Sequence, residues 1–199
     1  MDKEKNNQNK PDIKDEILLV ALHLFSQQGF HNTALKDIAQ AIGAKTTSLI
    51  YQHYENKQAI AQCLYDTIID NLNVSIDEIR RRTKKPSEQL REIVGLLFRL
   101  RVDAPEVLRF LYFTNISEIL PAVPGLLKSP PYQKILKVMQ AGMRCDEIKN
   151  LDPVFAYAAF FGIIEQTLRL SLQNELTKDL DVSQSQAWLL AWSVISKKN

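Results

Sequence analysis

The chain has 199 residues, of which 45% are hydrophobic and 24% are charged, and this composition excludes a largely disordered chain because it allows a sizeable core. With only 6 Gly and 8 Pro, it also disfavours turn-rich all-β folds and glycine-rich fibrous folds. The formal net charge of +2 is too small to indicate a nucleic-acid partner by itself.

Hydropathy and cysteine usage exclude several other classes of protein. The longest uncharged apolar run, residues 153–164, is well short of the roughly 20 residues that span a bilayer. The polar segment 1–10 has no apolar stretch typical of a secretory signal, and we expect it to be a flexible tail. Cys63 and Cys145 lie far apart, without a spacing typical of disulfide scaffolds or zinc sites. We therefore expect a cytoplasmic protein with no membrane contact, no metal and no cofactor.

Helices are predicted along almost the whole chain, because apolar residues recur every three to four positions and no stretch alternates long enough for a strand. Ile17, Ala21 and Phe25 share one face of the first predicted helix, residues 12–28, which ends at Gly29. A short helix follows, with Thr33 as its predicted N-cap and Gly43 at its end. The other predicted helices cover residues 45–54, 57–82, 87–103, 105–120, 131–147, 153–176 and 182–197. The predicted fold is all-α, with about nine helices.

Two short helices around a turn at Gly43, preceded by a longer helix, are the components of a helix-turn-helix unit. In such a unit the second short helix enters the major groove, about 12 Å wide, while the first crosses the DNA backbone. The sequence therefore predicts a DNA-binding domain of residues 1–58. The helix over residues 57–82 joins it to a predicted C-terminal helical bundle domain of residues 59–199.

Short hydroxyl side chains, amphipathic rings and positive charges around the second short helix are the candidate DNA contacts. Hydroxyl groups can face base edges, whereas Tyr51 and His53 can reach phosphates. Backbone amides near Thr33 and Thr46 add phosphate-binding capacity at two helix N-termini. The complete candidate set is Thr33, Lys36, Lys45, Thr46, Thr47, Ser48, Tyr51, Gln52, His53 and Lys57.

A family pattern extends over residues 13–60. Residues 17–33 read ILLVALHLFSQQGFHNT, with Ala-x-x-Leu-Phe followed by Gly, an aromatic residue and Thr. This pattern resembles the TetR family of one-component transcriptional regulators, whose helical C-terminal domain differs with the ligand. Gly43 to Tyr51 is one residue longer than the usual family spacing, and Lys45 stands where the family often has Ser. The later positions that match are Lys36, Asp37, Ile38, Ala39, Gly43, Ile50, Tyr51, His53, Tyr54, Asn56 and Lys57.

The last two predicted helices indicate a homodimer. Small residues such as Ala158 and Gly162 permit close helix approach, and Trp188, Leu189 and Trp192 add more apolar surface than one small domain is expected to bury. A dimer would also place two recognition helices on half-sites about 34–36 Å apart, one turn of DNA.

An effector site is predicted in the C-terminal domain, because aromatic and polar residues recur there at similar depths and would line a mostly apolar cavity. Its candidate residues are Phe98, Arg101, Tyr112, Asn115, Glu118, Met139, Met143, Phe160 and Gln166.

The predicted function is a transcriptional regulator, a repressor that a small hydrophobic or amphipathic effector releases from operator DNA. The alternative is an all-helical small-molecule-binding or protein-interaction module that never binds DNA. An enzyme is not expected, because the three histidines lack metal-ligand spacing and the sequence has no Gly-rich phosphate loop or nucleophile elbow. The basic run from Arg80 to Lys85 is interpreted as a solvated helix terminus, where cations are favourable.

Overall fold

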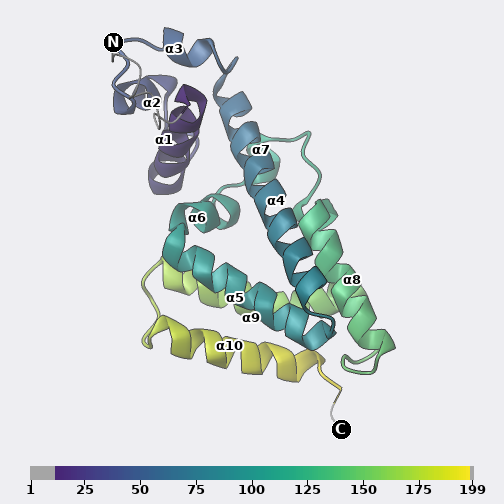
Figure 1. The fold of residues 1–199 in the computed structure, drawn as a ribbon. Coiled ribbons are helices and arrows are strands. Elements are labelled where there is room, and N and C mark those ends of the chain that lie inside the picture. The colour runs from purple at the N-terminus through teal and green to yellow at the C-terminus, as the bar shows by residue number, and fades with distance from the viewer. Residues whose placement is uncertain (1–11, 198–199) are drawn as a thin grey trace, which may run out of the picture.

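The computed structural model describes residues 12–197, so the N-terminal tail predicted over residues 1–10 lies outside the described part of the chain. Ten α-helices and one short 3-10 helix make up the described fold (Figure 1). They are α1 (Ile13–Gln28), α2 (Leu35–Ala41), α3 (Ser48–Tyr51), α4 (Lys57–Arg82), α5 (Pro86–Asp103), α6 (Pro105–Phe113), α7 (Ile116–Ile119), η1 (Leu126–Lys128), α8 (Pro130–Arg144), α9 (Pro153–Leu172) and α10 (Leu180–Ile195). The all-α prediction is confirmed.

The helix predicted over residues 105–120 is in fact two helices, α6 and α7, which brings the number of α-helices to ten. The chain becomes extended at Thr114, where ψ is 130°. Next to this break, the Asn115 amide donates to Glu118, and the Ser117 hydroxyl donates to Asn115. Polar side chains that bond locally in this way compete with the helical backbone pattern, so they favour a break here.

The ends of α1 and the start of α2 are fixed by local hydrogen bonds. Asp12 caps α1 by accepting from the Lys14 N–H at 3.2 Å, and Gly29, with φ of 86°, ends the helix as predicted. The N-cap of α2 is Ala34 rather than Thr33, and the Asp37 carboxylate accepts from the Ala34 N–H at 2.7 Å. The prediction of Thr33 as N-cap is therefore wrong.

The helices pack so that α4 connects the two ends of the molecule. Figure 1 shows α1, α2 and α3 around the N-terminal end of α4, while α8 lies along its other half. Helix α5 starts at the C-terminal end of α4 and runs away from it, and α10 lies farthest away, beside α9. Helix α6 lies between α1 and α5. The buried apolar side chains form one cluster, from Ile17 in α1 to Ile195 in α10. No helix within residues 12–197 has the length and apolar character needed to cross a membrane.

Candidate nucleic-acid interface

Helices α2 and α3 meet at a tight turn that Gly43 makes possible. Gly43 has φ of 73°, a left-handed conformation that is costly for residues with a Cβ atom. The Ala44 N–H donates to the Ala39 carbonyl at 2.9 Å and closes the end of α2. Helix α3 is shorter than the predicted 45–54 helix, and its buried anchor is Ile50. The Tyr54 N–H donates to the Ile50 carbonyl at 2.9 Å, so helical bonding continues beyond the last residue of α3.

Most of the candidate DNA-contacting side chains lie on the surface around α2 and α3. The ring of Tyr51 is 56% exposed, although Ile50, its neighbour in α3, is completely buried. Thr47, His53 and Lys57 are half-buried. The exposed candidates are Lys36, Lys45, Thr46, Ser48, Tyr51 and Gln52. Helix α3 is thus held by one buried side chain and presents polar groups and an aromatic ring to solvent.

Thr33 is the exception among the candidates, because its side chain is only 1% exposed. Its hydroxyl donates to the Gly29 carbonyl at 2.9 Å and accepts from the Gln28 amide at 3.2 Å. Its backbone N–H donates to the Phe30 carbonyl. The hydroxyl and the backbone N–H of Thr33 thus already have partners within residues 28–33, so neither group is free for the predicted phosphate contact.

Lys57, the first residue of α4, is bonded to the α1–α2 loop. Its Nζ donates to the carbonyls of Phe30 and Thr33, each at 2.7 Å, and lies 4.2 Å from the centroid of the Phe30 ring. Burial lowers the pKa of Lys57, whereas the negative charge of Asp37 acts in the opposite direction. Lys57 therefore ties the long helix directly to the segment that precedes α2.

Sequence reasoning missed Gln40, which is exposed on α2 one helical turn after Lys36. The spacing of four residues was the available signal, because it places Gln40 on the same helix face as Lys36. Gln40 therefore joins the candidate contacts of α2.

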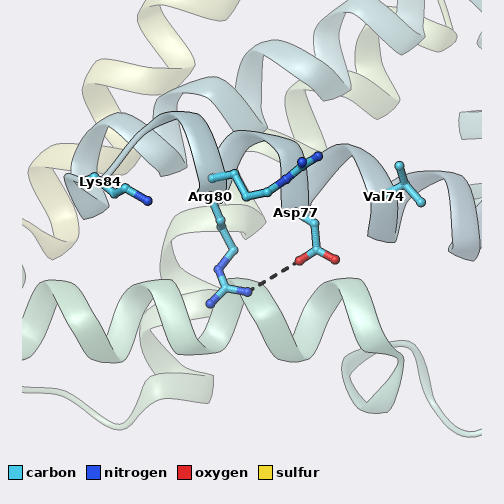
Figure 2. A pocket seen from close by; sticks show the side chains of 5 residues that line it. Val74, Asp77, Arg80 and Lys84 are labelled. Carbon is cyan, nitrogen blue, oxygen red and sulfur yellow. Dashed lines mark ion pairs between the residues drawn. The ribbon is translucent and has the colours of Figure 1, made fainter.

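The basic residues at the far end of α4 carry partners of opposite charge. A surface pocket of about 550 Å³ lies at this end. Figure 2 shows the Arg80 guanidinium turned toward Asp77, and the two groups lie 3.7 Å apart. Arg81 pairs with Glu78 at 3.9 Å, and Arg82 pairs with Glu92. This cluster lies at the opposite end of α4 from α2 and α3 (Figure 1). It agrees with the interpretation of a solvated helix terminus.

The nine candidate effector residues lie at different depths in the structure. Phe98, Met139 and Phe160 are buried in the core, and Met143 is half-buried. Tyr112 is buried and lies under the Arg169 guanidinium, 5.2 Å from its ring centroid. Asn115, Glu118 and Gln166 are exposed. Arg101 donates to the Ser171 carbonyl, near the C-terminal end of α9, at 2.9 Å. Helical spacing does not determine depth in the folded chain, so these residues do not form one layer, and an effector cavity lined by all nine stays a prediction.

A polar cluster that sequence reasoning missed lies between α8 and α9. The Tyr157 hydroxyl donates to Glu165 at 2.7 Å, and the buried Tyr132 ring lies 6.0 Å from the Tyr157 ring. Burial raises the pKa of Glu165, although the Tyr157 hydroxyl and Arg169 act in the opposite direction. The available signal was the position of Glu165, two helical turns after Tyr157 at the end of an apolar run.

An exposed apolar face extends over the last two helices. It contains Val154 and Phe155 on α9 and Val182, Leu189, Leu190 and Val194 on α10. Gly162 on α9 is also exposed, and a Cβ atom built there would meet no other atom within 4 Å. Exposed apolar surface of this extent on two neighbouring helices is typical of an interface.

Comparisons with known proteins agree with this arrangement. A family model described as "Bacterial regulatory proteins, tetR family" matches residues 17–63, which include α2 and α3. The "Biofilm operon icaADBC HTH-type negative transcriptional regulator IcaR" of Staphylococcus epidermidis is 39% identical over 142 residues, 71% of this chain and 70% of that protein. The alignments with the first curated relatives cover between 39% and 70% of the length of those proteins.

Solved structures share the fold over nearly the whole chain. A TetR family transcription regulator from Marinobacter aquaeolei VT8 has a TM-score of 0.77 and 19% identity, with 93% of this chain and 96% of that chain covered. The transcriptional regulator FadR from Bacillus subtilis, in complex with stearoyl-CoA, has a TM-score of 0.67 and 21% identity, with 90% and 97% covered.

Proposed function

This chain belongs to the TetR family of bacterial regulatory proteins, and from this premise we propose that it is a transcriptional repressor that a small effector releases from operator DNA. The observation that carries the proposal is the surface of α2 and α3, where Tyr51, Lys45 and Ser48 are exposed above the buried anchor Ile50. Side chains of this kind on a short helix suit contacts with base edges and phosphates in a major groove.

In this proposal, residues 1–58 bind DNA, and residues 59–199 bind the effector and form the dimer. Helix α4 belongs to both parts, since Lys57 bonds to the α1–α2 loop while Lys134 of α8 pairs with Asp77 near the other end. A tilt of α4 would therefore change the position of α2 and α3 relative to the C-terminal domain. In a dimer this changes the separation of two recognition helices whose half-site spacing the duplex fixes.

The proposed dimer forms through the exposed apolar face of α9 and α10. Leu189, Leu190 and Phe155 contribute the largest exposed side chains of this face. The surface around Gly162 leaves room for a helix of a second copy to approach closely. A two-fold axis through this face would present two recognition helices to the DNA together.

The proposed effector is a small hydrophobic or amphipathic molecule whose polar group bonds inside the C-terminal domain. The polar cluster of Tyr157 and Glu165 can supply such a bond, and the Nε of Arg101 is buried with no hydrogen-bond partner among the described residues. The stearoyl-CoA in the Bacillus subtilis FadR structure is one example of an amphipathic ligand in a protein with this fold. The effector would release DNA only if it binds two arrangements of the dimer with different affinity.

DNA binding is tested by selecting duplexes from a random pool and measuring fluorescence anisotropy with the selected duplex. We expect binding that weakens steeply with salt, because phosphate contacts release counterions. Tyr51→Ala should weaken binding at least about tenfold, which corresponds to about 1.4 kcal/mol. The control is Val74→Ala, since Val74 is equally exposed on α4 but lies away from α2 and α3. A failure to enrich any duplex would instead favour a helical module that does not bind DNA.

A further inference from the structure

A second small-molecule site is suggested by a pocket of about 390 Å³ where α1 and the α1–α2 loop face α6 and α7. One wall belongs to the proposed DNA-binding domain and includes Phe30 and His31. The other wall belongs to the C-terminal domain and includes Arg109, Phe113 and Glu118. Its volume lies in the lower part of the range of small-molecule sites, about 300–1,000 Å³.

Aromatic side chains form the apolar part of this junction pocket. Phe113 of α6 lines the pocket and is 46% exposed, although phenylalanine is most often buried, and the Arg169 guanidinium lies 5.3 Å from its ring centroid. Across the pocket, on α1 and the α1–α2 loop, the buried Phe25 and Phe30 rings form a small cluster, 5.2 Å apart. A flat aromatic ligand would cover the exposed ring of Phe113 and contact the edge of this cluster.

Two charged residues that line the junction pocket differ in their partners: Glu118 has a basic partner, whereas Arg109 has no acidic one among the described residues. The Arg109 guanidinium donates through one nitrogen to the Leu172 carbonyl at 2.7 Å, and among residues 12–197 Arg109 takes part in no ion pair. Glu118, in contrast, faces His31 at 3.2 Å and accepts from the Asn115 amide at 3.1 Å. A guanidinium has five N–H donors, so Arg109 keeps donors for an anion.

We propose that the junction pocket binds a small aromatic carboxylate, with the carboxylate on Arg109 and the ring against Phe113. The two oxygens of a carboxylate match the guanidinium fork, and Arg109 and the aromatic ring of Phe113 line the same pocket. The pocket is separate from the polar cluster of Tyr157 and Glu165, whose residues do not line it.

Occupancy of the junction pocket would act on DNA binding, a consequence that rests on the proposed function. Its walls lie on α1 and on α6, so a ligand contacts both proposed domains and favours the arrangement in which both walls are in place. The site itself does not depend on this consequence, because binding of the carboxylate is measured without DNA.

The test measures binding of 1-naphthoate to the full chain by isothermal titration calorimetry, with the uncharged 1-naphthamide as the comparison ligand. The wild type should bind naphthoate more tightly than naphthamide. Arg109→Gln should weaken naphthoate binding at least about tenfold, as expected for loss of a charged hydrogen bond, and leave naphthamide binding unchanged. Arg99→Gln is the charge-matched control, since Arg99 is exposed on α5 and does not line the pocket.

A variant that is expected to tighten naphthoate binding distinguishes a direct role of the pocket charges in binding from a structural role. Glu118→Gln removes a negative charge from the pocket, so naphthoate binding should tighten by about twofold, a small effect because Glu118 is largely exposed. The melting temperature of each variant shows whether it is folded. Phe113→Ala should weaken the binding of both ligands, because it removes the aromatic ring that both contact.

Three results would overturn the proposal: no naphthoate binding to the wild type at millimolar concentration, equal binding of the two ligands, or an Arg109→Gln variant that is folded and binds naphthoate normally. If naphthoate binds as expected while the affinity for selected DNA stays the same, the site stands and its effect on DNA binding is refuted. If the protein binds no DNA duplex at all, the calorimetric results still show whether the junction pocket binds the carboxylate.

Discussion

At Lys57, two of the three ammonium donors go to the carbonyls of Phe30 and Thr33, which leaves one for a DNA phosphate. Lys57→Ala should therefore lower the free energy of unfolding by about 1–2 kcal/mol as well as weaken binding to all DNA sequences. The slope of log affinity against log salt should fall by about one unit. Chemical denaturation and anisotropy at several salt concentrations measure the two effects.

Lys45→Ala is the matched control for this prediction, because Lys45 is an exposed lysine at the same surface. It should lower the salt slope and leave the free energy of unfolding within about 0.5 kcal/mol of wild type. An unchanged salt slope in Lys57→Ala would show that Lys57 only positions the α1–α2 loop and contacts no phosphate.

Glu165 is predicted to make stability depend on pH. Burial raises the pKa of Glu165, so the folded protein holds this proton more tightly than the unfolded chain. The stability from this group is fully present below the unfolded pKa, near 4.5, and is lost as pH rises through the folded pKa. Glu165→Gln removes that loss, so its melting temperature should rise relative to wild type between about pH 5 and about pH 8.

Tyr157→Phe is the companion variant, since it removes the hydrogen bond that stabilises the charged Glu165 carboxylate. Its melting temperature should fall further below wild type as pH rises, the opposite trend to Glu165→Gln. Differences from wild type that are the same at both ends of the pH range would contradict this account of Glu165.

Among the elements, α3 depends most on its surroundings, because four residues form too few internal hydrogen bonds to persist alone. Its position is set by the buried side chain of Ile50 and by the turn at Gly43. The turn is therefore as important for presenting Tyr51 as the sequence of α3 itself.

Gly43→Ala should lower the free energy of unfolding by about 1 kcal/mol, because φ of 73° is strained for alanine. No atom lies within 4 Å of the position of the new Cβ, so the cost comes from the backbone and not from a clash. Gly125→Ala is the control: its surroundings are equally empty, but its φ is −49°, so alanine should be neutral or stabilising. Denaturant unfolding of both variants gives the comparison, and equal effects would argue against backbone strain at Gly43.

At the scale of the whole molecule, the exposed apolar face of α9 and α10 predicts a dimer in solution. Leu189→Arg should convert it to a monomer at micromolar concentration, because a charge would be buried without a partner at the interface. Light scattering measures the mass. Val102→Arg is the control, since Val102 on α5 has the same exposed fraction, 64%, and lies outside this face. A wild-type monomer, or dissociation by Val102→Arg alone, would refute this interface.

The amino-acid sequence alone predicts which segments are helical and where several of these helices end. The prediction of a helix over residues 57–82 agrees with α4 at both ends, and Gly29 and Gly43 end α1 and α2 as predicted. These features depend on apolar spacing, caps and glycine conformations, which act between residues a few positions apart. The family pattern over residues 13–60 likewise uses short spacings, so it was visible without a structure.

Which polar groups remain free to bind a ligand or DNA depends on how the helices pack in three dimensions. Lys57 bonds to residues 24 and 27 positions away, and Arg109 to a residue 63 positions away, and no local pattern encodes such partners. Thr33 is buried for the same reason, and Asn115 and Glu118 line the junction pocket, whereas Phe160 is buried in the core. Periodicity gives the face of a helix that is apolar, whereas depth and hydrogen-bond partners depend on which other helices pack against that face.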